Sequence, residues 1–277
     1  MQQRLAWWCI VVGALFAGAA QPVAASFHLI QIEQVIGGVN GDTSAQAIQL
    51  RLRFPGENLL EFARLVAWDN EGLNPITIVD FTQSVPGAAL GARVLVASPA
   101  FLALANPVIT ADFVIPMKTL IPPSYLAAGR VTYEGDTGAI YWSLSYGGSA
   151  YTGETIATAV NDADGDFGPP AEHSIPWQGV RALVFQGSPS GASLTNLDDY
   201  ALTAGPAVFT NNLGESAALC DIDLTTGTDL QSFATFQACF TDVPAPINAC
   251  CTIADFNGDQ AIDLGDYIDF HDALLGP

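Results

Sequence analysis

Twelve residues near the C-terminus have the residue types and spacing of a calcium-binding loop. Calcium takes about six to eight hard oxygen ligands, and a 12-residue loop supplies them from positions 1, 3, 5, 7, 9 and 12. Counted from residue 255, these positions carry side-chain or backbone oxygens: Asp255, Asn257, Asp259, the carbonyl of Ala261, Asp263 and Asp266. The sequence therefore predicts a calcium site here, in preference to an acidic turn that merely caps a helix.

Position 6 of this loop departs from the usual pattern. Gly is normally found there because the sharp turn needs a positive φ, whereas this chain has Gln260. A left-handed backbone costs a non-Gly residue about 1–2 kcal/mol. We therefore expect this substitution to weaken calcium binding without abolishing it.

A less complete copy of the loop lies 34 residues earlier, since Asp221 corresponds to Asp255. The copy keeps Asp223 and Asp229 but has Thr225 at position 5 and Ser232 at position 12. With the last carboxylate missing, we favour a loop retained for its shape, and a second calcium site is the alternative.

Aromatic residues follow both loops at helical spacing. Phe233 and Phe236 in the first copy correspond to Tyr267 and Phe270 in the second. A period near 3.6 predicts a helix with one apolar face after each loop.

This duplicated arrangement of loop and helix, over residues 220–277, resembles a type I dockerin. The resemblance implies a small α-helical module that docks onto a cohesin-like domain or a cell-surface protein. Calcium is structural in such a module, because the ion supplies folding energy that a small core lacks.

Four cysteines lie in the last 58 residues of the chain: Cys220, Cys239, Cys250 and Cys251. In an exported protein we expect them to form disulfides. A bond between the adjacent Cys250 and Cys251 would close a strained ring. We therefore expect Cys220 and Cys239 each to pair with one of these two, without deciding which. A zinc site is disfavoured because CxxC spacing and His partners are absent.

Residues 1–25 have the pattern of a secretory signal peptide. Arg4 precedes an apolar run at 5–20, and small residues follow at 23–25. No second apolar run is long enough to span a bilayer. The mature chain is therefore expected to have no membrane span and to be secreted, extracellular or on the cell surface, with a retained signal anchor as the alternative.

The composition indicates a folded and strongly acidic protein. Half of the residues are hydrophobic, which argues against disorder. There are 28 acidic and 8 basic residues, giving a net charge of −20. Because phosphate binding needs clustered Lys and Arg, nucleic acid is excluded as a partner. We attribute the overall charge mainly to solubility, although it also attracts divalent cations.

Residues 26–213 are predicted to form an antiparallel β-sandwich, followed by a linker at 214–219. Residues 48–54 alternate strictly between apolar and polar, which predicts one buried and one wet face. A Gly-containing loop at 134–138 predicts a hairpin, and 99–105 is the one short helix expected. Further strands are predicted at 27–36, 62–68, 76–81, 93–97, 113–115, 151–160, 181–186 and 200–203.

Segments 27–33, 91–97 and 129–131 resemble lamin-tail-like domains of secreted bacterial proteins. The resemblance implies an Ig-like sandwich with a binding or structural role.

Other candidate sites in this domain are weaker. Asp162, Asp164 and Asp166 flank Gly165 and predict a further calcium site, with an ordinary polar turn as the alternative. No nucleophile elbow, P-loop or HExxH pattern is present, so we expect a non-enzymatic protein. The alternatives are a glycoside hydrolase with paired carboxylates and a carbohydrate-binding protein that contacts polysaccharide. For the second alternative, three tryptophans are candidates, although a core position is favoured for them: Trp68, Trp142 and Trp177.

Overall fold

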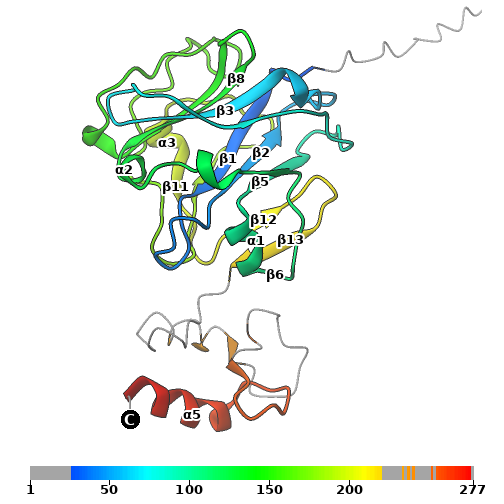
Figure 1. Ribbon diagram of the computed structural model, residues 1–277, viewed down its shortest axis with the longest axis vertical. Helices are drawn as coiled ribbons and strands as arrows, with labels where there is room; N and C mark the ends of the chain where they lie inside the picture. Colours follow the sequence, from blue (N-terminus) through cyan, green and yellow to red (C-terminus); the bar gives the residue numbers. More distant parts are fainter. Residues whose placement is uncertain are drawn as a thin grey trace, which may run out of the picture.

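The computed structural model describes residues 26–219, 233, 236–237, 239–240, 251 and 254–275. Within these residues the fold is mainly β, as predicted, and most helices are short (Figure 1). The exception is α5 (Leu264–Leu275), the longest described helix. We call residues 26–219 the β-domain and residues 220–277 the C-terminal segment.

The largest sheet of the β-domain has six strands in the order β11-β10-β1-β2-β5-β7. Its strands are β1 (Ile30–Ile36), β2 (Ala47–Leu52), β5 (Arg93–Ala97), β7 (Phe113–Val114), β10 (Leu183–Phe185) and β11 (Tyr200–Leu202). Every neighbouring pair is antiparallel except β5 and β7, which are parallel. Ile48 lies opposite both Val35 and Val96, which fixes the register at the centre of the sheet.

A second sheet has four antiparallel strands in the order β4-β3-β8-β9. These are β3 (Ala63–Trp68), β4 (Ile76–Asp80), β8 (Gly129–Gly135) and β9 (Ile140–Tyr146). The hairpin predicted around 134–138 is confirmed as the β8–β9 connection, where Gly138 has the positive φ (+84°) that the turn requires.

The third sheet corrects the predicted domain boundary. β12 (Val208–Thr210) pairs with β13 (Ser216–Leu219), which also pairs with β6 (Ala105–Asn106). Residues 214–219 are therefore a turn and a strand of the β-domain, where we predicted a linker. The prediction failed because a polar turn separates these two short strands. In β13 the apolar alternation is short, with Ala217 and Leu219 buried in the core.

The short helices lie in the connections between strands. They are α1 (Pro99–Leu104), α2 (Pro123–Leu126), α3 (Asn196–Asp199) and the 3₁₀ turns η1 (Leu60–Phe62), η2 (Met117–Thr119) and η3 (Gly148–Ala150). The predicted helix at 99–105 is confirmed as α1. It begins after Ser98, whose Oγ accepts the N–H of Phe101, as expected of an N-cap.

Two apolar cores make the β-domain a three-layered structure. One core joins the six-stranded sheet to the four-stranded sheet and contains Ile32, Leu50, Val131 and Trp142. The other lies on the opposite face of the six-stranded sheet, against β12, β13 and α1. In Figure 1 the strands β3 and β8 lie above β1, β2 and β5, and the β12–β13 hairpin lies below β5.

Because both faces of the six-stranded sheet are covered, the prediction of one wet face for residues 48–54 is wrong. All six residues of β2 are buried. Arg51 reaches Glu33 at 2.8 Å, and Arg93 donates to the same carboxylate from the next strand, also at 2.8 Å. Gln49 adds an amide hydrogen bond to Glu33 at 2.7 Å. These bonds compensate the cost of removing the charges from water.

The strand predicted at 151–160 is also wrong. Its one ladder-type contact is an isolated bridge between Ile156 and Asp166. The Thr152 N–H instead donates to Asn70 O, so the segment follows the loop at residues 69–72. A Cβ at Gly153 would lie 2.6 Å from the backbone nitrogen of Gly72, so glycine permits this close approach.

Candidate metal centre and other polar sites

The loop at 255–266 brings three of its predicted ligands together. Oxygen atoms of Asp255, Asp259 and Asp266 all lie within 4.8 Å of one another. Among the residues that the structure describes, no other set of three acidic, histidine or cysteine side chains converges in this way. The donors are all carboxylates, which suit a hard cation such as calcium or magnesium.

Asp266 connects the two ends of the loop. It lies in the first turn of α5 and is fully buried. Its Oδ1 accepts the N–H of Phe256 at 2.8 Å, and its Oδ2 accepts the N–H of Asp263 at 3.0 Å. This carboxylate therefore sets the distance between the start of the loop and the start of the helix.

Asp255 holds the turn of the loop from the other side. Its Oδ1 accepts the N–H of Gly258 at 2.8 Å, and its Oδ2 accepts the N–H of Gln260 at 3.1 Å. Gln260 has φ +65°, so the sharp turn expected at position 6 is present with a non-Gly residue in it. The strain predicted from the sequence is therefore located at this residue.

The remaining predicted ligands border the group of three. Asn257 Nδ2 donates to Asp259 Oδ2 at 3.2 Å, while Asp259 Oδ1 accepts the N–H of Ala261 at 2.9 Å. Asp263 precedes α5, and its Oδ1 accepts the N–H of Gly265 at 2.7 Å. Asp263 thus caps the helix, which keeps its carboxylate close to the loop but outside the converging group.

The charge of the C-terminal segment is not compensated by its own side chains. Residues 220–277 include ten aspartates and no Lys or Arg, and His271 is the one residue there that can become cationic. His271 lies 3.6 Å from Asp272, on the exposed part of α5. Carboxylates gathered within a few ångströms repel one another unless a cation lies between them.

A small aromatic core lies beside the loop. Phe236 stacks on Phe270 with ring centroids 4.7 Å apart, and Phe233 lies 6.4 Å from Tyr267. These are the pairs related by the 34-residue offset, so the two copies of the aromatic pattern pack on each other. Ile262, at position 8 of the loop, is fully buried in the same cluster.

Cys239 and Cys251 form a disulfide. The prediction that Cys239 pairs with one member of the adjacent cysteines is thus confirmed. Cys220 and Cys250 lie outside the described residues. The same holds for the first loop, whose predicted ligands were Asp221, Asp223 and Asp229.

The loop at 161–166 does not gather its carboxylates. Asp162 is buried, and its Oδ1 accepts the N–H groups of Asp164 (3.0 Å) and Gly165 (2.9 Å). Asp166 Oδ1 accepts the N–H of Gly168 instead. Burial raises the pKa of Asp162, whereas the N–H of Asp166 lowers the pKa of Asp164. Each carboxylate supports its own turn, so the structure favours the alternative of an ordinary turn over a further calcium site.

The three tryptophans do not share an exposed surface. Trp142 is fully buried and donates its Nε1–H to Tyr200 Oη at 2.8 Å. Trp68, on β3, donates to Thr132 Oγ1 at 2.9 Å. Trp177 is half-buried in the loop that precedes β10. A flat sugar-binding face made of all three rings is therefore excluded.

A groove lined by two carboxylates was not predicted from the sequence. The groove has a volume of about 610 Å³ and lies between β4 and β7, with Asp80 and Asp112 in its lining. Burial raises the pKa of Asp112, and its Oδ2 accepts the N–H groups of Leu95 (2.7 Å) and Asn212 (2.9 Å). The two carboxylates are 32 positions apart in the chain, and no local pattern connects them.

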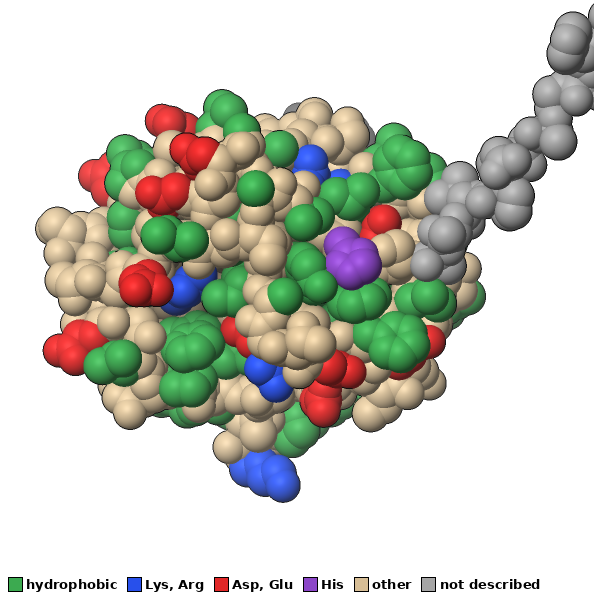
Figure 2. All heavy atoms as spheres, turned by 90° about the horizontal axis from the view of Figure 1, so that it is seen from above, with side chains coloured by type: hydrophobic (Ala, Val, Ile, Leu, Met, Phe, Trp, Pro, Cys, Tyr) green, Lys and Arg blue, Asp and Glu red, His purple; other side chains and the backbone are tan. Residues whose placement is uncertain are grey.

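On the face of the molecule seen from above, the charged side chains are dispersed (Figure 2). Figure 2 shows carboxylates as separate groups over one face of the molecule, with apolar side chains between them. Within the described residues, no helix is long and apolar enough to cross a membrane. Neither a known protein-family profile nor a curated protein sequence matches the chain.

Proposed function

We propose that this chain is a secreted, non-enzymatic protein with a calcium-stabilised, dockerin-like docking module at its C-terminus and a β-domain with a binding or structural role. The observation that carries the proposal is the convergence of Asp255, Asp259 and Asp266 within 4.8 Å. It occurs in a segment that has no Lys or Arg to balance them. An external cation is the simplest source of the missing positive charge.

The bound ion would have a structural role. Asp255, Asp259 and Asp266 would hold it, with Asn257 and Asp263 beside them. Because Asp266 belongs both to the loop and to the first turn of α5, neutralising this group stabilises the junction between loop and helix. The same helix contributes Phe270 to the aromatic core, so ion binding and core packing support each other.

An apolar surface next to this core supports a docking role. A groove of about 400 Å³ is lined by Phe233, Phe236, Gln237, Phe240, Leu264 and Tyr267. Leu264 and Ile268, one helical turn apart on α5, are 68% and 62% exposed. Large apolar side chains exposed side by side are typical of protein interaction sites. The partner proposed is a cohesin-like domain or a cell-surface protein.

Isothermal titration calorimetry of the full chain tests the calcium site. After removal of metals with a chelator, calcium is expected to bind and to increase the helical circular-dichroism signal. Asp266→Asn should weaken binding at least tenfold, about 1.4 kcal/mol, because it removes a charged ligand while keeping the shape. Asp269→Asn, on the exposed side of α5, is the matched control and should bind as the unaltered chain does.

The docking role is tested by binding to a purified type I cohesin domain with and without chelator. Leu264→Glu with Ile268→Glu should abolish capture while calcium binding remains. Absence of calcium binding in the unaltered chain would remove the basis of the proposal. Normal calcium binding without calcium-dependent capture would reject the docking role alone.

A polysaccharide-degrading enzyme is the alternative function, and the groove between β4 and β7 is the observation that favours it. Asp80 and Asp112 would be its acid and base, as glycosidases use paired carboxylates. Release of reducing sugar from polysaccharides, lost in Asp80→Asn, would establish this alternative. The two backbone N–H bonds to Asp112 indicate instead that this carboxylate supports the fold.

A further inference from the structure

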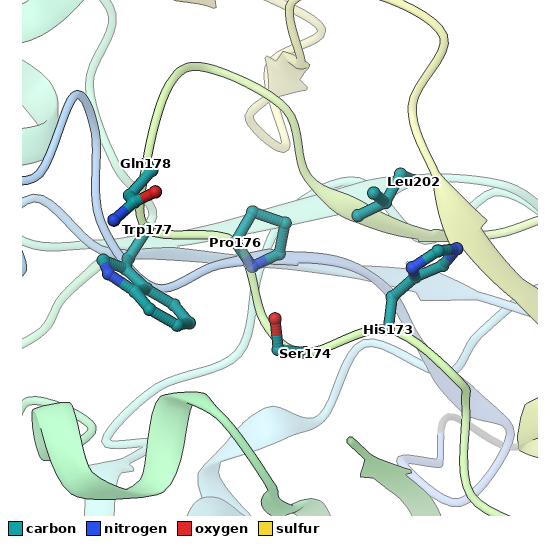
Figure 3. A pocket seen from close by; sticks show the side chains of 6 residues that line it. All are labelled: His173, Ser174, Pro176, Trp177, Gln178 and Leu202. Atoms are coloured by element: carbon teal, nitrogen blue, oxygen red, sulfur yellow. The ribbon is translucent and has the colours of Figure 1, made fainter. Parts of the chain in front are cut away.

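A small pocket on the β-domain surface is formed by the loop that precedes β10. It has a volume of about 190 Å³ and is lined by His173, Ser174, Pro176, Trp177, Gln178 and Leu202. Figure 3 shows the rings of Trp177 and His173 on opposite sides, with Ser174 and Pro176 between them. Leu202, from β11, lies on the His173 side.

The backbone of this loop is fastened to neighbouring elements. Pro176 O accepts the N–H of Gly37 at 2.7 Å, and Trp177 O accepts the N–H of Gly41 at 2.9 Å. The Ile175 N–H donates to Leu126 O at 3.1 Å. A Cβ at Gly38 would lie 3.0 Å from Trp177 Cβ, so glycine lets the tryptophan approach the chain. The pocket is therefore held in place before any ligand arrives.

The polar side chains of the pocket are unused in the fold. In the part of the chain that the structure describes, the imidazole of His173, the hydroxyl of Ser174, the indole N–H of Trp177 and the amide of Gln178 make no hydrogen bond to protein. The other two internal tryptophans do use their indole N–H, on Tyr200 and Thr132. A fixed backbone with free donors and acceptors is the arrangement expected of a binding site.

The chemistry of the lining selects the kind of ligand. None of the described residues that line the pocket is Asp, Glu, Lys or Arg, so a charged ligand would find no counter-charge among them. Trp177, Pro176 and Leu202 offer apolar surface, while the hydroxyl, amide and ring nitrogens offer hydrogen bonds. The volume is below the roughly 300–1,000 Å³ of sites for drug-sized ligands. A ligand that meets these conditions is small, neutral and rich in hydroxyls, with one apolar face.

We propose that this pocket binds a single neutral sugar ring, which stacks on Trp177 and bonds to His173, Ser174 and Gln178 through its hydroxyls. The site lies wholly in the β-domain and does not depend on calcium or on the docking role. It would give the β-domain a carbohydrate ligand. Because the pocket is small and open, we expect a dissociation constant on the order of 1 mM.

Saturation-transfer NMR of the full chain, in excess chelator, tests the proposal. The probes are the methyl glycosides of glucose, galactose, mannose and N-acetylglucosamine. At least one is expected to bind with its ring protons in contact with an aromatic side chain. Glucuronate should bind several-fold more weakly than the methyl glucoside, because no cation faces its carboxylate. The chelator separates this result from any failure of the calcium site.

Substitutions inside and outside the pocket test where the sugar binds. Trp177→Ala should weaken it at least tenfold, while Trp68→Phe, which lies outside the pocket, should leave it unchanged. Since Trp177 also packs against the main core, the exposed pair His173→Ala and Gln178→Ala gives a second test without a core change, and should weaken binding several-fold. Three outcomes would overturn the proposal: no binding of any glycoside at millimolar concentration, binding that survives in both sets of variants, or stronger binding of a tetraproline peptide.

Discussion

The β-domain and the C-terminal segment each contain a buried carboxylate, and the two carboxylates have different partners. Seven of the eight basic residues of the chain lie between residues 51 and 181, and the eighth is Arg4. In the β-domain, Glu33 is buried between Arg51 and Arg93. In the C-terminal segment, Asp266 is also buried, and among the described residues its hydrogen bonds all come from backbone N–H groups. Glu33 thus has its counter-charges within the sequence, whereas the C-terminal segment has no Lys or Arg and, in our proposal, takes its counter-ion from solution.

The two regions also differ in how much core they can form. The main core of the β-domain joins two sheets, whereas the described core of the C-terminal segment has five buried residues. A segment of 58 residues seldom forms a core large enough to be stable without a cross-link or a metal. The disulfide between Cys239 and Cys251 and the carboxylate group at 255–266 are two such supports. Four substitutions test these differences between the two regions.

Glu33→Gln should have the largest effect and should destabilise the β-domain alone. It leaves Arg51 buried without its counter-charge, which costs about 3 kcal/mol in comparable cases. Denaturant unfolding followed by tryptophan fluorescence measures the loss, because the three tryptophans that follow the predicted signal peptide, Trp68, Trp142 and Trp177, all lie in the β-domain. Glu172→Gln, at an exposed position, should change little. A loss that calcium restores would contradict the idea that the arginines of this region are the counter-charges of Glu33.

Replacing Cys239 and Cys251 together by serine should lower the stability of the C-terminal segment by about 2–3 kcal/mol, as expected for a short closed loop. Calcium should oppose the loss, because ion and disulfide support the same small core. Helical circular dichroism with increasing calcium measures the compensation. The fluorescence transition of the β-domain is the internal control, and a shift in that transition would show that the two regions are not independent.

Gln260→Gly should tighten calcium binding by a few-fold. Glycine removes the strain of φ +65°, although part of the gain is lost because glycine is freer in the unfolded chain. Gln260→Ala is the matched control, since it removes the side chain and keeps the strain. Equal affinities of the glycine and alanine variants would show that the turn is not what limits binding.

Asp112→Asn should have the smallest effect, visible as a change in pH dependence. Burial raises the pKa of Asp112 in the fold above its ordinary value of 3.8. The folded state therefore binds the proton more tightly than the unfolded chain. The contribution to stability is fully present below the ordinary pKa and is lost as pH rises through the raised one. The difference in unfolding free energy between the original chain and the variant should thus fall as pH rises from about 4. A difference independent of pH would contradict this.

Much of the fold could be predicted because apolar alternation is local information. The strand at 93–97 was predicted with its observed bounds, and the hairpin at 134–138 was identified from its glycines. The covered polar face of β2 could not be predicted, because its burial depends on a hairpin some 160 residues later, where the Thr210 N–H donates to Gln49. That hairpin was itself too short to be recognised from its pattern.

The candidate sites also differ in how far they could be predicted from local sequence. The loop at 255–266 was found because its ligands follow one another at fixed spacing, and three of them converge as expected. The helix-capping role of Asp263 was not foreseen. The pocket around Trp177 left no signal in the sequence beyond the tryptophan itself. The types of its lining residues follow no pattern along the chain. What distinguishes the polar ones is that their side chains make no hydrogen bond to protein in the described part of the chain.

The position of β1 at the middle of its sheet has a consequence for how the protein is made. β1 is the first strand among the described residues, yet Gln34 pairs with Val184 of β10 on one side while β2 occupies the other. A ribosome must therefore add some 150 residues before the first strand can complete its hydrogen bonds. Pairings so distant in the chain slow folding. Until β10 has been synthesised, one edge of β1 therefore has no strand to pair with.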